Sequence, residues 1–167
     1  MPRFEIRRLL VADVEDYRTI RLASLQTEPE AFGSVYEVEL THPIESFVER
    51  LASSIVVGAY AGGRIVGVAV FQQEVGPKER HKGVVAGVYV QPDARGQGVA
   101  AALIAAVIDF ARNVVEQLTL AVVQGNGAAI TLYHRFGFKV YGVEPRARKH
   151  SDGYVDKVLM VLDLRAG

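Results

Sequence analysis

The sequence predicts one α/β (α+β) domain that is built on a mixed sheet. Strand-like and helix-like segments follow one another in the order β-α-α-β-β-β-α-β-α-β-β. Helices therefore lie between and after strands, which is typical of this class. The 167 residues, 50% of them hydrophobic, are enough to bury a proper core. No repeat, low-complexity tract or long linker divides them, so we expect a single domain over residues 1–167.

The first half of the chain shows the strand period and the helix period in turn. Phe4–Leu9 alternates polar and apolar residues, and Asp13 is a suitable N-cap for the helix that follows. Pro43 suits the start of a second helix. Gly62-Gly63 is a strong hairpin signal between two β-branched stretches. The expected elements are strands at 4–9, 54–60 and 65–73 and helices at 13–25 and 43–52.

The second half is organised around Gly87–Arg112, which predicts a strand, a tight loop and a buried apolar helix. Pro92 ends the strand because proline cannot donate to a ladder. Gly96 and Gly98 leave backbone N–H groups uncovered where the helix begins, and Arg95 adds a positive charge. The loop is therefore expected to bind an anion such as phosphate. The remaining expected elements are strands at 83–90, 117–124, 138–143 and 154–164, helices at 100–110 and 128–136, and a basic loop between the last two strands.

One interpretation of this loop is a dinucleotide site, because Gly96-x-Gly98-x-x-Ala101 fits the fingerprint G-x-G-x-x-G/A. Five residues, one of them a proline, separate the strand from the first glycine, whereas the fingerprint follows its strand almost directly. The next strand, Gln117–Val123, is followed by Gln124 and Gly125 and not by the acidic residue that would hold a ribose. A dinucleotide-dependent oxidoreductase is therefore disfavoured.

A second interpretation rests on Arg95, Gly98 and Ala100, which form Arg-x-x-Gly-x-Ala after Val90-x-Pro92. This arrangement resembles the acetyl-CoA loop of the GNAT family of N-acetyltransferases, and the order of elements is similar over essentially the whole chain. The resemblance implies a mixed, mostly antiparallel seven-stranded sheet with about four helices, splayed between the fourth and fifth strands, where acetyl-CoA lies. It implies cofactor contacts from Val88, Tyr89, Val90, Arg95, Gly96, Gln97, Gly98, Val99, Ala100 and Ala101.

Asn126 and Tyr133 form a second constellation. They lie seven residues apart, so on a helix both project from nearly one face, about 10 Å apart along the axis. The segment is similar to the family pattern N-x-x-(A/S)-x-x-x-Y, which implies that Asn126 binds the pantetheine arm and that Tyr133 protonates the thiolate. A phenol is protonated at neutral pH, as a general acid must be. Taken alone, Asn126 also suits a helix N-cap and Tyr133 also suits a core position.

The general base is not assigned. Some relatives that acetylate protein N-termini carry a glutamate on the strand before the asparagine, where this chain has Ala121, Val122 and Val123. Glu74 or a chain of waters are the alternatives. Six glutamates and no Lys or Arg between Thr27 and Glu49 predict an acidic rim that attracts a cationic amine. The candidate acceptor-pocket residues are Tyr36, Glu37, Glu74, Tyr154 and Asp156.

These observations together predict an acetyl-CoA-dependent N-acetyltransferase that acts directly on a primary amine of a small molecule or peptide. The alternative is a non-catalytic acyl-CoA-binding module with the same fold. Equal numbers of basic and acidic residues, 19 each, argue against nucleic-acid or membrane binding through bulk charge. The chain has no cysteine, which excludes a thiol nucleophile and is compatible with a cytoplasmic location, and the four scattered histidines predict no metal site. A homodimer is left open.

Overall fold

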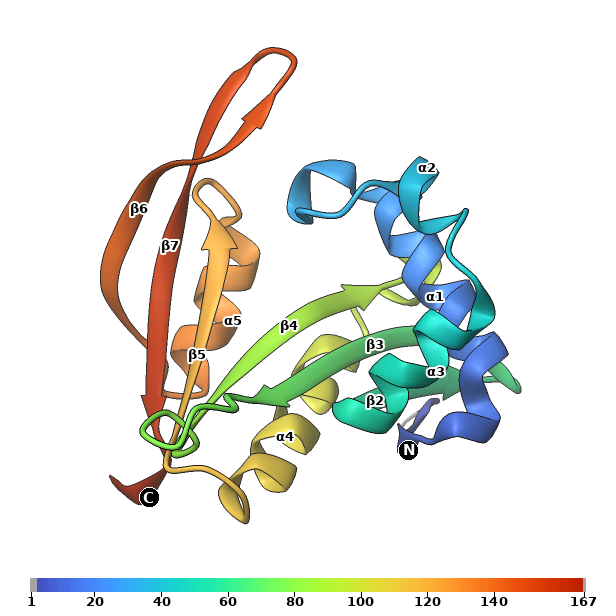
Figure 1. Ribbon diagram of the computed structural model, residues 1–167, viewed down its shortest axis with the longest axis horizontal. Coiled ribbons are helices and arrows are strands. Elements are labelled where there is room, and N and C mark those ends of the chain that lie inside the picture. The colour runs from blue at the N-terminus through green and yellow to red at the C-terminus, as the bar shows by residue number, and fades with distance from the viewer. Residues whose placement is uncertain (1–2, 167) are drawn as a thin grey trace. The chain divides into compact units, whose positions relative to one another are not determined.

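The computed structural model describes residues 3–166 and contains the seven strands that the sequence predicts (Figure 1). The strand order is β1-β2-β3-β4-β5-β7-β6. The pairs β1–β2, β2–β3, β5–β7 and β6–β7 are antiparallel, and β4 pairs parallel with β5. The prediction of a mixed, mostly antiparallel sheet is confirmed. The strands are β1 (Glu5–Leu9), β2 (Ile55–Ala61), β3 (Arg64–Gln73), β4 (Lys82–Val90), β5 (Gln117–Val123), β6 (Lys139–His150) and β7 (Gly153–Asp163).

The described residues form five α-helices, where the sequence predicted about four. The additional helix is α2, which has four residues and is too short to show a helical period. The helices are α1 (Val14–Thr27), α2 (Tyr36–Glu39), α3 (Ile44–Ser53), α4 (Val99–Arg112) and α5 (Gly127–Arg135). None of these helices within residues 3–166 is long and apolar enough to cross a membrane.

The chain is made of two compact units. Unit 1 consists of Met1–Gln72 and Val85–Phe110, and unit 2 consists of Gln73–Val84 and Ala111–Gly167. Within unit 2, Lys82–Val84 of β4 pair in parallel with Gln117–Thr119 of β5. The single domain over residues 1–167 stays a prediction.

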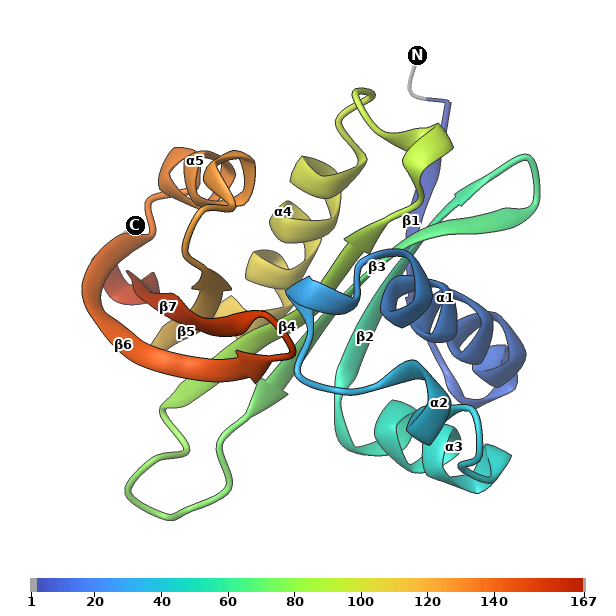
Figure 2. The same ribbon diagram turned by 90° about the horizontal axis from the view of Figure 1, so that it is seen from above.

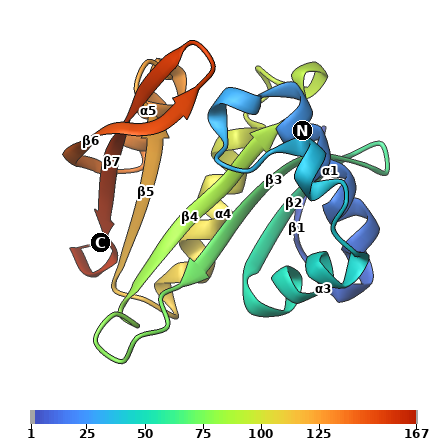
Figure 3. The same ribbon diagram turned by 45° about the horizontal axis from the view of Figure 1, so that its top comes forward.

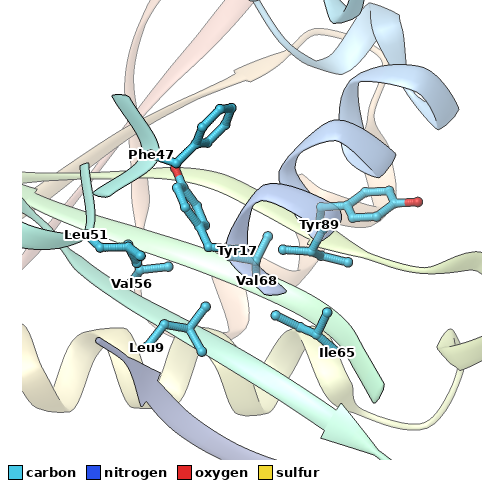
Figure 4. Close-up of a cluster of buried hydrophobic side chains, with 9 residues drawn as sticks. Leu9, Tyr17, Phe47, Leu51, Val56, Ile65, Val68 and Tyr89 are labelled. Carbon is cyan, nitrogen blue, oxygen red and sulfur yellow. The ribbon is translucent and has the colours of Figure 1, made fainter. Parts of the chain in front are cut away.

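Unit 1 buries an apolar cluster between its strands and the helices α1 and α3 (Figure 4). Tyr17 of α1 meets Phe47 of α3 edge-to-face at 6.1 Å between ring centroids. Both helices lie on one side of the strands and α4 lies on the other (Figure 1). Gly67 of β3 permits this second layer, because a Cβ there would lie 3.0 Å from the Leu103 side chain of α4. The cluster comprises Leu9, Tyr17, Ile20, Phe47, Leu51, Val56, Ile65, Val68 and Tyr89.

Unit 2 contains β5, the long β6–β7 hairpin and α5 (Figures 2 and 3). The sequence placed a basic loop after Val143, and this prediction is wrong, because β6 continues to His150. The pairing register shifts between Glu144 and Arg148, and Arg146 adopts a left-handed φ of 47° within this bulge. A bulge on an edge strand accommodates the proline at position 145, so the strand resumes beyond it.

Candidate active site

The loop between β4 and α4 has a backbone that a ligand can approach closely. A 3₁₀ turn at Pro92–Ala94 follows β4, and Gly96 and Gly98 have φ values of 76° and 84°. Such values favour glycine, which carries no Cβ to clash. A Cβ at either position would meet no atom within 4 Å, so space beside the loop is open.

Backbone donors at the start of α4 are free within the described chain. The first hydrogen bond of the helix runs from the Ala102 N–H to the Gly98 carbonyl at 3.0 Å. The N–H groups of residues 96–101 donate to no acceptor among residues 3–166. Free N–H groups and the positive end of the helix dipole attract an anion. This segment, from Gly96 to Ala101, is therefore suited to hold a pyrophosphate.

Arg95 is already held in the structure. Its Nε donates to the Val90 carbonyl at 3.0 Å, and its Nη2 forms an ion pair with Glu28. The guanidinium lies 5.9 Å from the centre of the Tyr89 ring. A phosphate at this loop would therefore meet a positioned arginine.

In the second half of β4, the backbone groups are better placed than the side chains to contact a ligand. Gly87 has a left-handed φ of 62°, which interrupts the regular strand. Val88 is half-buried and Val90 is buried, and the Tyr89 side chain belongs to the unit 1 core and donates its hydroxyl to Gln91 at 3.0 Å. Any contact of these three residues with a pantetheine arm would use their backbone groups.

Asn126 and Tyr133 both lie in unit 2, on and before α5. The Asn126 Oδ1 accepts from the Ala129 N–H at 3.3 Å, so this residue is the N-cap of α5. The Tyr133 ring packs edge-to-face on Phe138 at 5.8 Å, and burial raises the pKa of its phenol to about 12. The phenol therefore stays protonated at neutral pH. No described residue accepts from its hydroxyl. The hydroxyl oxygen is not fully buried, so a ligand or solvent can reach it.

The candidate acceptor residues are divided between the two units. Tyr36 is half-buried and Glu37 is exposed on α2 in unit 1. In unit 2, Glu74 is half-buried, Tyr154 is exposed, and Asp156 accepts from the Arg146 N–H at 2.7 Å. The Arg146 guanidinium also lies 5.7 Å from the Tyr154 ring, so one bulge residue touches both β7 candidates.

The prediction of an acidic rim is wrong for Glu39. This residue is only 3% exposed, and its carboxylate accepts from Arg21 and Arg50. Burial alone would raise the pKa of Glu39, but the hydrogen bonds from both arginines lower it to about 2. Glu28 is likewise paired, with Arg95. Two of the six glutamates therefore neutralise arginines of unit 1 and do not form an acidic rim.

The basic residues of β6 between Arg146 and His150 include side chains with buried polar atoms. Arg148 Nη1 and His150 Nε2 are buried and have no hydrogen-bond partner among the described residues. Burial lowers the pKa of Arg148, and the charge of Glu144 partly offsets this effect. A hydrogen bond from these nitrogens to an acidic partner would stabilise them.

The sequence of residues 18–138 matches the acetyltransferase (GNAT) family. This chain belongs to the GNAT family. An L-methionine sulfoximine/L-methionine sulfone acetyltransferase of Pseudomonas aeruginosa is 33% identical over 117 residues, which cover 69% of this chain and 67% of the relative. The L-amino acid N-acetyltransferase AaaT of Escherichia coli is 28% identical over 155 residues, covering 89% and 93%. The GNAT chain is therefore an N-acetyltransferase, as predicted.

Solved structures agree on the GNAT fold. A GNAT-family acetyltransferase from Streptococcus pneumoniae superposes with a TM-score of 0.84 at 21% identity, covering 96% of this chain and 98% of that chain. The yncA structure from Salmonella typhimurium, which holds acetyl-CoA, gives a TM-score of 0.83 at 22% identity, covering 97% and 94%. The co-substrate follows from family membership, because GNAT acetyltransferases use acetyl-CoA. No cluster of His, Asp and Glu within residues 3–166 could hold a metal ion.

Proposed function

We propose that this acetyltransferase moves the acetyl group of acetyl-CoA to the α-amino group of a free amino acid. The observation that carries the proposal is the pair of relatives described above. At 33% and 28% identity, both are named for acetylation of amino acids or their close analogues. This narrows the primary amine that the sequence predicted to one class.

The cofactor contacts divide between loop and strand. The free N–H groups of Gly96–Ala101 and the positioned Arg95 bind the pyrophosphate, and the backbone of Val88–Val90 pairs with the pantetheine arm. Three observations support the loop assignment: two left-handed glycines, open space beside them and donors without a described acceptor. Asn126 contributes its amide nitrogen to the same cofactor while its oxygen caps α5.

The transfer is direct. The neutral amine attacks the thioester carbonyl, the bond from carbon to sulfur breaks, and the CoA thiolate takes a proton from Tyr133. The new amide loses one proton to solvent or to a base, for which Glu74 is a candidate. A pKa of about 12 keeps Tyr133 protonated until the thiolate forms, and its hydroxyl is free of a described acceptor. Withdrawal of the leaving sulfur from water would raise the pKa of the CoA thiol and favour transfer of this proton to it.

A second candidate acceptor is the N-terminus of a protein. A ribosomal-protein-alanine N-acetyltransferase from Brucella melitensis has a TM-score of 0.82 at 25% identity, covering 95% of this chain and 99% of that chain. The segment Ala121–Val123 of β5 lacks the glutamate that some relatives acting on protein N-termini carry on this strand. We therefore favour the free amino acid.

The test is release of free thiol from acetyl-CoA with a panel of amines. The panel contains the free L-amino acids, L-methionine sulfone, L-methionine sulfoximine, a polyamine and a peptide with an N-terminal alanine. We expect turnover with one or more free amino acids and little with the peptide. Turnover with the peptide alone would favour the second candidate. Binding of acetyl-CoA without thiol release for any amine would leave only the non-catalytic module.

A further inference from the structure

One arginine of α1, Arg21, has hydrogen-bonding capacity that the fold does not use. The Arg21 guanidinium donates Nε and Nη2 to the two oxygens of Glu39, at 3.3 Å and 2.9 Å. A guanidinium carries five N–H groups, and the edge formed by Nε and Nη2 uses two of them. No described residue accepts from Nη1. This nitrogen is not fully buried, so it remains accessible. The outer edge of Arg21 is therefore open to a ligand.

The charges around Arg21 do not balance. Arg50 also donates to Glu39, at 2.8 Å, so two guanidinium charges face one carboxylate and one positive charge remains. The side chains of Arg21 and Glu39 are only 17% and 4% exposed. An uncompensated charge that is mostly withdrawn from water is costly, and an anion that reaches it is bound strongly.

Arg21 lies beside β4. A Cβ built on Gly87 would stand 4.0 Å from Arg21 Nη1, and because position 87 is glycine this space stays empty. Gly87 comes directly before Val88–Val90, the backbone segment assigned above to the pantetheine arm. The half-buried Phe32 lies 5.6 Å from the guanidinium carbon and limits the direction of approach. An anion on the open edge of Arg21 would sit next to the strand that holds the thioester arm.

We propose that the open edge of Arg21 binds the carboxylate of the amino-acid acceptor. The proposal rests on the proposed function, because only an acceptor with a carboxylate beside its amine can use this edge. Nη1 and the outer N–H of Nη2 form a planar pair of donors that fits the two oxygens of one carboxylate. Glu39 fixes the plane of the guanidinium and Arg50 cancels the charge of Glu39. Arg21 is thus the residue that selects an amino acid over its amide.

The test compares the best amino-acid acceptor with its carboxamide, in wild type, Arg21→Lys and Arg50→Lys. Charged hydrogen bonds of this kind correspond to about a tenfold to hundredfold preference for the acid in wild-type kcat/KM. Arg21→Lys keeps a charge against Glu39 but loses the planar donor pair. We expect it to raise KM for the acid by a similar factor, with kcat and the amide reaction little changed. Arg50→Lys alters the same ion-pair network away from the open edge and should keep the preference.

The outcomes separate this proposal from the proposed function. Wild type that acetylates no amino acid would overturn both. Wild type that prefers the acid, with the same preference in Arg21→Lys, would overturn only the role of Arg21. Equal loss of preference in both lysine variants would show that the ion-pair network acts structurally, and would also overturn it. If Arg21→Lys does not fold, Arg21→Gln, which can still donate to Glu39, gives the same comparison.

Discussion

The carboxylate of Glu28 forms an ion pair with the guanidinium of Arg95, the arginine of the loop between β4 and α4. Glu28 is the C-cap that directly follows α1, and it lies 67 positions from Arg95 in the sequence. The pair therefore attaches the cofactor loop to the helical part of unit 1. A phosphate that binds Arg95 must share it with Glu28 or displace Glu28.

This competition predicts that Glu28→Gln tightens acetyl-CoA binding. Exposed ion pairs contribute up to about 1 kcal/mol, so the dissociation constant should fall by up to about fivefold. Isothermal calorimetry measures this directly. Glu30→Gln, which removes the same charge from an exposed neighbour, is the control and should change little. Weaker binding in Glu28→Gln would show that the ion pair orients Arg95 rather than competing for it.

The second prediction concerns Gly98. A branched side chain there occupies the space beside the free N–H groups, so Gly98→Val should weaken acetyl-CoA binding at least tenfold while the fold persists. Gly62→Val is the matched control, because Gly62 also has a left-handed φ and a Cβ there would meet no atom within 4 Å. Both variants should melt at lower temperature through backbone strain of about 1–2 kcal/mol. Equal acetyl-CoA affinity in the two variants would remove Gly98 from the cofactor site.

The third prediction concerns stability in acid. The pKa of Glu39 is about 2 in the folded chain against its usual 4.5. A lowered pKa stabilises the fold above the unfolded value, so this contribution is present above pH 4.5 and disappears as pH falls towards 2. The expected size is about 3 kcal/mol. Urea unfolding measures the free energy of unfolding of wild type and Glu39→Gln. The difference between the two should be smaller at pH 3 than at pH 7.

The control for this effect is Glu37→Gln on the same helix, where the carboxylate is exposed. Its unfolding free energy should stay within about 0.5 kcal/mol of wild type at both pH values. Glu39→Gln leaves two arginines with no carboxylate, so it should lose about 3–5 kcal/mol at pH 7. A gap that does not change with pH would show that Glu39 does not titrate in this way.

Features set by neighbouring residues could be predicted from the sequence. Gly62-Gly63 gives a hairpin because both residues adopt left-handed φ values, 60° and 78°. The start of α4 follows from Gly98 and the apolar run after it. Such elements depend on local backbone sterics and on hydrophobic periodicity, which a single sequence displays.

Features set by distant partners could not be predicted. Glu39 looks like one more surface glutamate, and only the fold brings Arg21 to it across 18 positions and Arg50 across 11. Pro145 looks like the end of a strand, yet the edge position of β6 and the bulge at Arg146 let pairing resume. In each case the sequence shows the charge or the backbone restriction but not the partner that compensates it.

The last prediction separates a general acid from a core residue at position 133. Tyr133→Phe removes one hydroxyl that has no described acceptor and keeps the ring against Phe138. Ring packing should therefore survive, with less than about 1.5 kcal/mol change in stability. Acetyl-CoA affinity should also persist, because the loop at Gly96–Ala101 supplies it. The single-turnover rate with a true acceptor should fall by about 10²–10⁴, the usual contribution of general acid catalysis.

Tyr60→Phe is the control, because it should lower stability without changing the rate. Its hydroxyl donates to Asp16 at 2.8 Å in unit 1, so the variant should lose stability and keep its rate. Single-turnover measurement is needed for both, because product release often limits steady-state turnover and would hide a slower proton transfer. A Tyr133→Phe enzyme with a wild-type single-turnover rate and lower stability would make Tyr133 a core residue. The CoA thiolate would then have to take its proton from water or from another side chain.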